Sequence, residues 1–282
     1  MERQKRVALI NDVTGFGRCS TAVQLPIISA MGVQACILPT AILSAHTGYP
    51  TYYFNDYTDH MEAYMNNWKE LNVTFDGIST GFLGSKEQIE LVISFIKKFR
   101  TKHTKVVIDP VMGDDGQLYA TYTEEMCEEM KHLIEYADVL TPNLTEACRL
   151  LDLDYSKVEI TEETLQAIVR SLCEKGPSKV IITGLQKEDR VLNYFYERNG
   201  EEGFLGTKKV VESRPGTGDV FSAVITGAEM LNIPLKEAVA LSANFIQEGL
   251  IITKEQNTPR NDGICFESAL KNFILKVGQM SQ

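Results

Sequence analysis

Residues 214–223 read Arg-Pro-Gly-Thr-Gly-Asp-Val-Phe-Ser-Ala, and this stretch predicts a glycine-rich turn that opens a helix. The helical pattern begins at Gly218, so Gly216, Thr217 and Gly218 form the turn at the helix N-terminus. Glycine lets a backbone approach a ligand closely, and the free N–H groups and dipole of a helix N-terminus attract anions. Asp219 lies in the first turn. It is either an acid that stabilises the helix by about 0.3–1 kcal/mol through the helix dipole, or a general base beside a phosphate.

Short β-branched runs alternate with longer amphipathic stretches along the whole chain. This alternation predicts an α/β fold with a mostly parallel sheet covered by helices on both faces. The last two runs flank a polar segment with Asn199 and Gly200, which predicts an antiparallel hairpin at one edge. The predicted strands are residues 7–10, 35–38, 77–80, 105–108, 139–140, 180–183, 191–196 and 204–211. The predicted helices are residues 21–31, 59–71, 86–100, 123–136, 145–151, 161–174, 218–231, 235–253 and 266–277.

The composition is that of an ordinary globular protein, with 44% hydrophobic and 23% charged residues. Without a linker or repeat, we expect residues 1–282 to form a single domain. No apolar run approaches the roughly 18–20 residues of a membrane span, and the run at 7–10 is too short for a signal peptide. The net charge of −10, with no basic stripe, argues against nucleic acid. Six scattered cysteines predict free thiols in a reducing cytoplasm.

Acidic residues follow the strand at 105–108, where ligands of a parallel sheet usually bind. Asp109 ends the strand, and Asp114 and Asp115 lie in the glycine-containing loop after it. Carboxylates in this position suit Mg²⁺, which takes one or two protein carboxylates plus waters and phosphate oxygens. An acidic, solvated turn is the alternative.

Two further blocks follow predicted strands. Asn143 and Glu146 have the spacing of a helix N-cap and the acid of a capping box. Thr183 and Gly184 form a small-residue turn after the strand at 180–183. Neither block specifies a function by itself.

Taken together, these blocks resemble the ribokinase superfamily. The Gly-Thr-Gly-Asp sequence at 216–219 is similar to its G-[TA]-G-D signature, and 109–116 (DPVMGDDG) to a block of pyridoxal and hydroxymethylpyrimidine kinases. The N-x-x-E block at 143–146 and the Ile-Thr-Gly block at 182–184 occur in the same order. The resemblance covers about residues 105–225 and implies a three-layer αβα ribokinase-like fold.

The resemblance also implies roles for these residues. Asp219 would be the catalytic base, and the turn before it the anion hole. The loop around 114–122 would close over ATP, and adenine would contact the hairpin and the helix around 243–250. Mg²⁺ would be the required ion, with K⁺ an activator common in the family. The implied ATP-binding residues are Asp114, Asn143, Thr183, Gly184 and Gly218, and the implied metal residues are Asp109, Asp114 and Glu146.

The acceptor side resembles pyridoxal kinases in two places. Residues 44–49 (SAHTGY) are similar to their S-x-H-T-G-Y block, which implies that Thr47 contacts a pyridine substrate. His46 fits a hydrogen-bonding scaffold better than an acid or base. Residues 81–85 (GFLGS) are similar to G-Y-L-G-S, with Phe82 in place of tyrosine. The ring keeps its capacity to stack and loses the hydroxyl.

The first strand departs from the family pattern. Many pyridoxal kinases have a serine after this strand, and Asn11 takes its place here. Asparagine both donates and accepts, so it could bind a ring nitrogen or a phenolic oxygen. Asp12 adds a charge, which leads to the hypothesis that it favours pyridoxamine. The following residues 15–18 (GFGR) are similar to a bacterial subgroup of pyridoxamine kinases.

The expected function is therefore ATP-dependent phosphorylation of the 5′-hydroxymethyl group of a vitamin B6 vitamer in pyridoxal phosphate salvage. The alternative is hydroxymethylpyrimidine kinase of thiamine biosynthesis, and the block at 46–48 favours vitamin B6. A non-catalytic vitamer-binding protein on the same fold is a third possibility, but the candidate catalytic and metal acids are all present. We expect a cytoplasmic enzyme with a small-molecule substrate, no nucleic-acid or membrane partner and, by resemblance, a homodimeric state.

Overall fold

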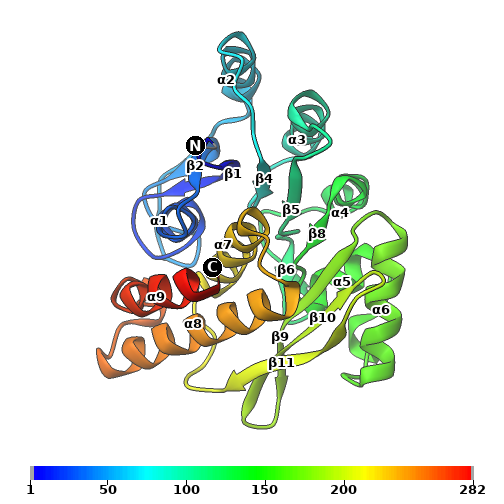
Figure 1. Ribbon diagram of the computed structural model, residues 1–282, viewed down its shortest axis with the longest axis vertical. Helices are drawn as coiled ribbons and strands as arrows, with labels where there is room; N and C mark the ends of the chain where they lie inside the picture. The colour runs from blue at the N-terminus through cyan, green and yellow to red at the C-terminus, as the bar shows by residue number, and fades with distance from the viewer. Residues whose placement is uncertain (1–2, 281–282) are drawn as a thin grey trace.

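The computed structural model describes residues 3–280 and shows an α/β fold in three layers (Figure 1). Within these residues, most strands of the main sheet run parallel, with antiparallel strands at both edges. The α/β class and the edge hairpin are therefore confirmed. The nine strands follow the order β11 (Glu202–Lys208), β10 (Arg190–Glu197), β9 (Lys179–Lys187), β8 (Val139–Leu140), β5 (Lys105–Ile108), β4 (Gly77–Thr80), β1 (Arg6–Thr14), β2 (Gln34–Leu43) and β3 (Phe54–Asp56).

Two layers of helices cover the faces of this sheet (Figure 1). One layer contains α1 (Ser20–Ala30), α7 (Thr217–Leu231), α8 (Leu235–Glu255) and α9 (Leu270–Met280). The other contains α2 (Thr58–Glu70), α3 (Lys86–Phe99), α4 (Glu124–Leu133), α5 (Leu144–Leu150) and α6 (Glu162–Glu174).

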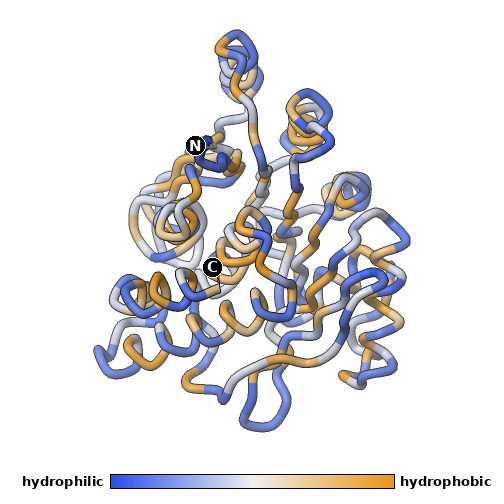
Figure 2. The backbone as a smooth tube through the Cα atoms, in the orientation of Figure 1, coloured by the Kyte–Doolittle hydropathy of each residue, from blue (hydrophilic) through white to orange (hydrophobic). Residues whose placement is uncertain are grey.

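Alternate residues of the central strands supply the two cores. In β1, Val7 and Leu9 pack toward the α1 and α7 layer, and Ala8 and Ile10 pack toward the opposite layer. All four are fully buried, which explains why this run is apolar throughout, as expected of a strand covered on both faces. Figure 2 shows orange segments along the strands and alternating blue and orange segments along the helices.

Hydroxyl side chains determine where several helices begin. Ser85, Thr123 and Thr161 each accept a backbone N–H from the first turn of α3, α4 and α6. Such caps satisfy N–H groups that have no partner inside the helix.

The first two strands are longer than the sequence predicts. β1 continues past Ile10 to Thr14, with a register shift against β2 between Asn11 and Val13. Asn11 and Asp12 therefore lie inside the strand and are buried. The polar residues misled the prediction, because alternation and apolarity are the signals that mark a strand.

Several elements differ from the expected boundaries. The edge strand β3 and the two-residue strands β6 (Gly113–Asp114) and β7 (Gln117–Leu118) are too short for a periodic signal. The prediction at 204–211 runs three residues beyond β11. The prediction at 266–277 was wrong at its start, because a 3₁₀ turn at Glu267–Ala269 precedes α9.

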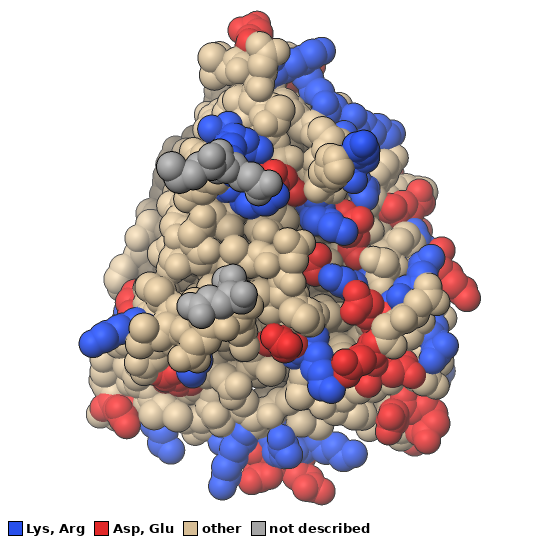
Figure 3. All heavy atoms as spheres, in the orientation of Figure 1, with Lys and Arg blue, Asp and Glu red and all other residues tan. Residues whose placement is uncertain are grey.

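The surface carries both signs of charge. In Figure 3, basic and acidic side chains intersperse along the rim of the face in view. Among residues 3–280, no helix is both long enough and apolar enough to cross a membrane.

Candidate active site

The candidate active site lies where α7 begins, beside the residue that follows β5. Gly216 caps the helix with φ +84°, and a Cβ at this position would lie 2.1 Å from the carbonyl oxygen of Arg18. Around Gly218, by contrast, a Cβ would meet nothing within 4 Å. The Thr217 hydroxyl turns back to donate to the carbonyl of Arg214 at 3.1 Å. The structure thus forms a tight turn with open space at the helix N-terminus.

Asp219 is half-buried in the first turn of α7. Burial raises its pKa to about 7; nearby Asp12 also acts to raise it, whereas hydrogen bonds from the Ser20 backbone and the Asn11 side chain act to lower it. Nε2 of Gln24 donates to Asp219 Oδ1 at 3.4 Å. A carboxyl with this pKa can accept a proton near neutral pH, which is the property of a general base.

Glu146 is held by backbone N–H groups at the start of α5. Asn143 Oδ1 accepts the Glu146 N–H at 2.9 Å, and Glu146 Oε2 accepts the Asn143 N–H at 2.8 Å. This confirms the predicted capping box. Glu146 Oε1 accepts the N–H of Met112 at 3.1 Å, which ties the helix to the segment after Asp109.

Asp109 and Glu146 form a buried acidic pair. Burial raises the pKa of both groups, and repulsion from Glu146 and Asp219 raises that of Asp109 further. Asp114 is exposed, with Oδ1 accepting the N–H of Asp115 at 2.9 Å. Across residues 3–280, no three His, Cys, Asp or Glu side chains gather closely enough to hold a metal directly. The few carboxylates present fit Mg²⁺ that keeps most of its waters. A cation there would also relieve the repulsion between Asp109 and Glu146.

The loop after Asp109 forms a small hairpin, β6 and β7, anchored to α5. Asn143 Nδ2 donates to the carbonyl of Gly113 at 2.7 Å, and the N–H of Gly116 donates to Thr145 Oγ1 at 2.8 Å. The same side chain that caps α5 thus holds the base of the hairpin, so the position of this loop depends on Asn143.

Thr183 and Gly184 lie inside β9, which continues to Lys187, so the predicted turn after residue 183 was wrong. The Thr183 N–H donates to the carbonyl of Pro142 at 2.8 Å, and Thr183 pairs with Asn143 in a parallel bridge. Gly184 has φ +71°, with open space where a Cβ would be. The structure therefore brings these two positions next to the Asn143 cap.

On the acceptor side, Asn11 and Phe82 are joined directly. Asn11 Oδ1 accepts the N–H of Phe82 at 2.9 Å. The side chain of Asn11 packs so closely on Gly81 that a Cβ there would lie 2.4 Å from Asn11 Nδ2. Asp12 is also buried, with Oδ2 accepting the Thr14 hydroxyl at 2.6 Å. The oxygen of Asn11 is therefore engaged by the protein itself.

Residues 46–49 are tied to the segment after α8. His46 Nδ1 accepts the Gly48 N–H at 3.1 Å, so Nε2 carries the hydrogen that bonds the Asn261 carbonyl at 2.6 Å. The hydroxyl of Tyr49 donates to Asp262 Oδ1 at 2.7 Å. His46 is thus a scaffold residue, as the sequence indicates. Thr47 is exposed between these anchors, and within residues 3–280 its side chain has no hydrogen-bond partner.

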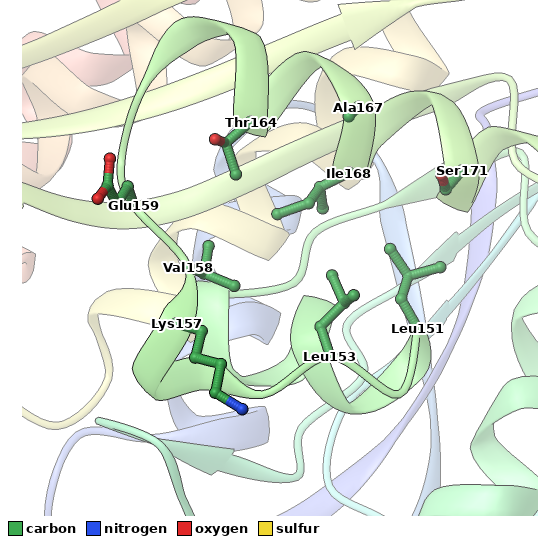
Figure 4. Close-up of a pocket in the computed structure, with 9 residues that line it drawn as sticks. All are labelled: Leu151, Leu153, Lys157, Val158, Glu159, Thr164, Ala167, Ile168 and Ser171. Carbon is green, nitrogen blue, oxygen red and sulfur yellow. The ribbon is translucent and has the colours of Figure 1, made fainter.

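Two surface hollows lie away from the candidate catalytic residues. The first, of about 510 Å³, is an apolar hollow between the end of α5 and α6 that contains Leu151, Leu153 and Ile168 (Figure 4). The second, of about 420 Å³, lies between the hairpin and α8 and is lined by Arg190, Lys208, Asn244 and Gln247 among others. The second coincides with the region where adenine contacts are expected.

Three contributors to the site were missed. Gln24 lies on the buried face of α1 one turn before Ile28, and a polar residue on an apolar face was a usable signal. Asn261 and Asp262 gave no such signal, because their partners His46 and Tyr49 lie more than 200 residues away in sequence.

The fold is that of ribokinase-like kinases. Two solved structures share the fold over nearly the whole chain. One is a candidate phosphomethylpyrimidine kinase from Bacteroides thetaiotaomicron, 42% identical, with a TM-score of 0.91 over 96% of each chain. Its orthorhombic crystal form contains pyridoxal. The other is pyridoxal kinase from Lactobacillus plantarum, 26% identical, with a TM-score of 0.89 over 97% of this chain and 98% of that one.

The chain belongs to the phosphomethylpyrimidine kinase family, whose model matches residues 24–263. Curated relatives of this chain carry names with different acceptors. A pyridoxine/pyridoxal/pyridoxamine kinase from Bordetella avium is 28% identical, over 85% of this chain and 82% of the relative. A hydroxymethylpyrimidine/phosphomethylpyrimidine kinase from Staphylococcus aureus is 31% identical, over 63% of each. The chain is therefore a phosphotransferase of this family.

Proposed function

We propose that this protein transfers the γ-phosphoryl group of ATP to the 5′-hydroxymethyl group of a vitamin B6 vitamer. The observation that carries the proposal is Asp219, a half-buried carboxyl with a raised pKa beside an open helix N-terminus. The SAHTGY block at 44–49 and the pyridoxal in the crystals of the 42% identical relative support the choice of acceptor.

In the proposed mechanism, the oxygen of the acceptor hydroxyl bonds to the γ-phosphorus, and Asp219 accepts the proton of that hydroxyl. The bond from that phosphorus to the β,γ-bridging oxygen breaks, and ADP leaves. Backbone N–H groups of Gly216, Thr217 and Gly218 stabilise the charge on the transferring group, since such preorganised donors are worth most where water is excluded.

The remaining assignments position the nucleotide and the ion. Asp114, Asn143, Thr183 and Gly184 would contact ATP. Asp109, Asp114 and Glu146 would hold the waters of Mg²⁺, which when bound neutralises phosphate charge; K⁺ would act as an activator. The capping box supports these assignments, because it fixes Glu146 and, through Asn143, the hairpin after Asp109.

On the acceptor side, Thr47 would bond a polar group of the pyridine and Phe82 would stack on its ring. Asn11 would act nearby through its amide. The hypothesis that Asp12 favours pyridoxamine stays a prediction, and its burial beside Thr14 makes an indirect effect the expected one. Unchanged vitamer preference in Asp12→Ala would contradict it.

Hydroxymethylpyrimidine kinase is the second candidate, because the Staphylococcus aureus relative carries that activity in its name and the family model is named for phosphomethylpyrimidine kinase. The test is an ATP-consumption assay with Mg²⁺, run in parallel on pyridoxal, pyridoxine, pyridoxamine and hydroxymethylpyrimidine. Turnover of a vitamer at micromolar KM would support the proposal. Turnover of hydroxymethylpyrimidine alone would reassign the protein, and vitamer binding without turnover would favour the non-catalytic alternative.

We further propose one domain over residues 1–282, a homodimer and a cytoplasmic location. The aromatic residues Tyr52, Tyr53 and Phe54 are exposed at the β3 edge of the sheet, which supports pairing of two copies there. Light scattering on the purified protein tests the dimer, and a monomeric mass across micromolar concentrations would contradict it.

A further inference from the structure

Two buried side-chain amides connect Asp219 to the loop that contains Phe82. Asn11 Oδ1 accepts the N–H groups of Asp12 and Phe82, both at 2.9 Å. Asn11 Nδ2 donates to Gln24 Oε1 at 3.2 Å, and Gln24 Nε2 donates to Asp219 Oδ1 at 3.4 Å. Asn11 and Gln24 are both 0% exposed, so water cannot replace either amide.

The direction of every hydrogen bond in this series follows from the bond between Phe82 and Asn11. Backbone N–H groups can only donate, so the atom of Asn11 that faces Phe82 must be oxygen and the other must be the NH₂ group. The atom of Gln24 that receives this NH₂ must then be oxygen. The NH₂ group of Gln24 therefore faces Asp219, whose carboxylate is the acceptor that completes the chain.

We propose that Asn11 and Gln24 are positioning residues that hold the Asp219 carboxylate through this one-way chain of hydrogen bonds, which we call the amide relay. The inference rests on the proposed function, in which Asp219 is the base. Hydrogen bonds that point the same way polarise and strengthen one another. The relay also links the acceptor loop to the base, so that displacement of Phe82 is transmitted to Asp219.

The amide relay opposes the repulsion that neighbouring acids exert on the Asp219 carboxylate. Asp12 from β1 and Asp109 after β5 are acids near the same carboxyl, and Cys19 lies beside it. Without a firm donor, the carboxylate would turn away from these acids. The Ser20 backbone and the Asn11 side chain also bond the carboxyl, and Gln24, held by Asn11, adds a donor to Oδ1 that restricts the carboxylate further.

The test is a double-mutant cycle on the full-length protein. Gln24→Met keeps the size of the side chain and removes the donor, and we expect kcat to fall ~10-fold with the KM for ATP unchanged, as for loss of one hydrogen bond to a charged group. Asn11→Ala breaks the same chain one step earlier. Since both variants disable one relay, we expect the double variant to be about as slow as the slower single variant.

Glu229→Gln is the matched control. Glu229 lies in α7, as Asp219 does, and pairs with Lys179 at 2.6 Å near the opposite end of the helix. We expect this variant to lower thermal stability and leave kcat unchanged. Losses in Gln24→Met and Asn11→Ala that multiply in the double variant would overturn the relay, since independent sites behave in that way.

A second measurement tests the hydrogen bonds of the amide relay directly, without a measurement of enzymatic turnover. The side-chain NH₂ signals of Gln24 and Asn11 are assigned by their loss in the two variants and followed by ¹H–¹⁵N NMR. Removing the acceptor charge with Asp219→Asn should shift both signals. If the wild-type protein phosphorylates none of the four acceptors but both signals shift, the proposed function fails and the relay stands. If neither signal shifts, the relay is overturned whatever the activity.

Discussion

A Cβ on Gly216 would lie 2.1 Å from the carbonyl oxygen of Arg18, closer than any real contact of this kind. The turn before α7 and the segment after β1 therefore fit together only when residue 216 lacks a side chain. Gly216 also has φ +84°, a conformation that costs other residues about 1 kcal/mol or more. Glycine at position 216 is therefore required for the packing of the turn against the Arg18 backbone, in addition to the close approach of a ligand.

Gly216→Ala is expected to separate these two segments. We expect a loss of about 2–3 kcal/mol in the free energy of unfolding, measured by urea denaturation, from backbone strain and steric overlap. We also expect a kcat/KM at least ~100-fold lower, because the turn supplies the N–H groups of the anion hole. Gly218→Ala is the informative comparison: its Cβ meets nothing within 4 Å, so stability should be kept while activity falls. Equal stability of wild type and Gly216→Ala would contradict the packing argument.

Asp219→Asn tests the assignment of the base. The amide cannot accept the proton of the acceptor hydroxyl, so we expect kcat to fall by ~10²–10⁴. ATP affinity, measured by calorimetry, should stay within about twofold, because the backbone N–H groups of the turn are unchanged. Near-wild-type turnover would remove Asp219 from the role of base.

The pH dependence of activity follows from the same carboxyl. Burial raises the pKa of Asp219 to about 7, and a base works only when it is ionised. Activity should therefore fall as the pH drops through 7, with kcat/KM losing a factor of about ten per pH unit on the acid side. A profile for the purified protein that stays flat down to pH 5 would show that a different group, or none, controls the reaction.

The contribution of Asp219 to folding stability should fall as the pH rises, whereas activity should fall as the pH drops. A carboxyl whose pKa is raised by folding binds its proton more tightly in the folded state, so its contribution to stability is present below about pH 4 and is lost as the pH rises through 7. Asp219→Asn removes this dependence. We expect its melting temperature to exceed that of wild type at pH 8, with a smaller difference at pH 5, measured by calorimetry without ligands. A difference that does not grow with pH would contradict the raised pKa.

Much of the fold and part of the site could be predicted from local patterns. The runs at 106–108 and 180–182 are apolar because both faces of their strands are covered, and the spacing of Asn143 and Glu146 matches a cap that the structure forms. Such features depend on residues close in sequence. The start of α7 is of the same kind, because its turn and its first acid lie within four residues.

The rest of the site depends on contacts between distant segments. The sequence suggested that Asn11 would bind substrate, whereas the structure engages its oxygen with Phe82, 71 residues away. One donor to Asp219 comes from Gln24, which is 195 residues away, and no motif of the sequence marks it. Periodicity and motifs report on local structure only, so these partners become visible only when the fold brings β1, α1, α7 and the segment after β4 together.

Tyr49→Phe tests the connection between the acceptor loop and the segment after α8. The Tyr49 hydroxyl donates to Asp262 at 2.7 Å, and burial together with this bond raises its pKa to about 12. Removing the hydroxyl leaves the ring contacts with His46 and Phe16 in place. Because Thr47 lies in the same loop, we expect the KM for the acceptor to rise by ~3–10-fold, about the worth of one hydrogen bond.

The KM for ATP should not change, since the nucleotide residues lie on the other side of Asp219 in the proposed mechanism. Tyr53→Phe is the control, because that ring is 66% exposed and belongs to the β3 edge. Asp262→Asn should reproduce the effect of Tyr49→Phe in part, because an amide oxygen still accepts the hydroxyl, though less strongly than a carboxylate. An equal rise in both KM values for Tyr49→Phe would mean that the bond stabilises the whole fold, and the loop would then have no separate role in acceptor binding.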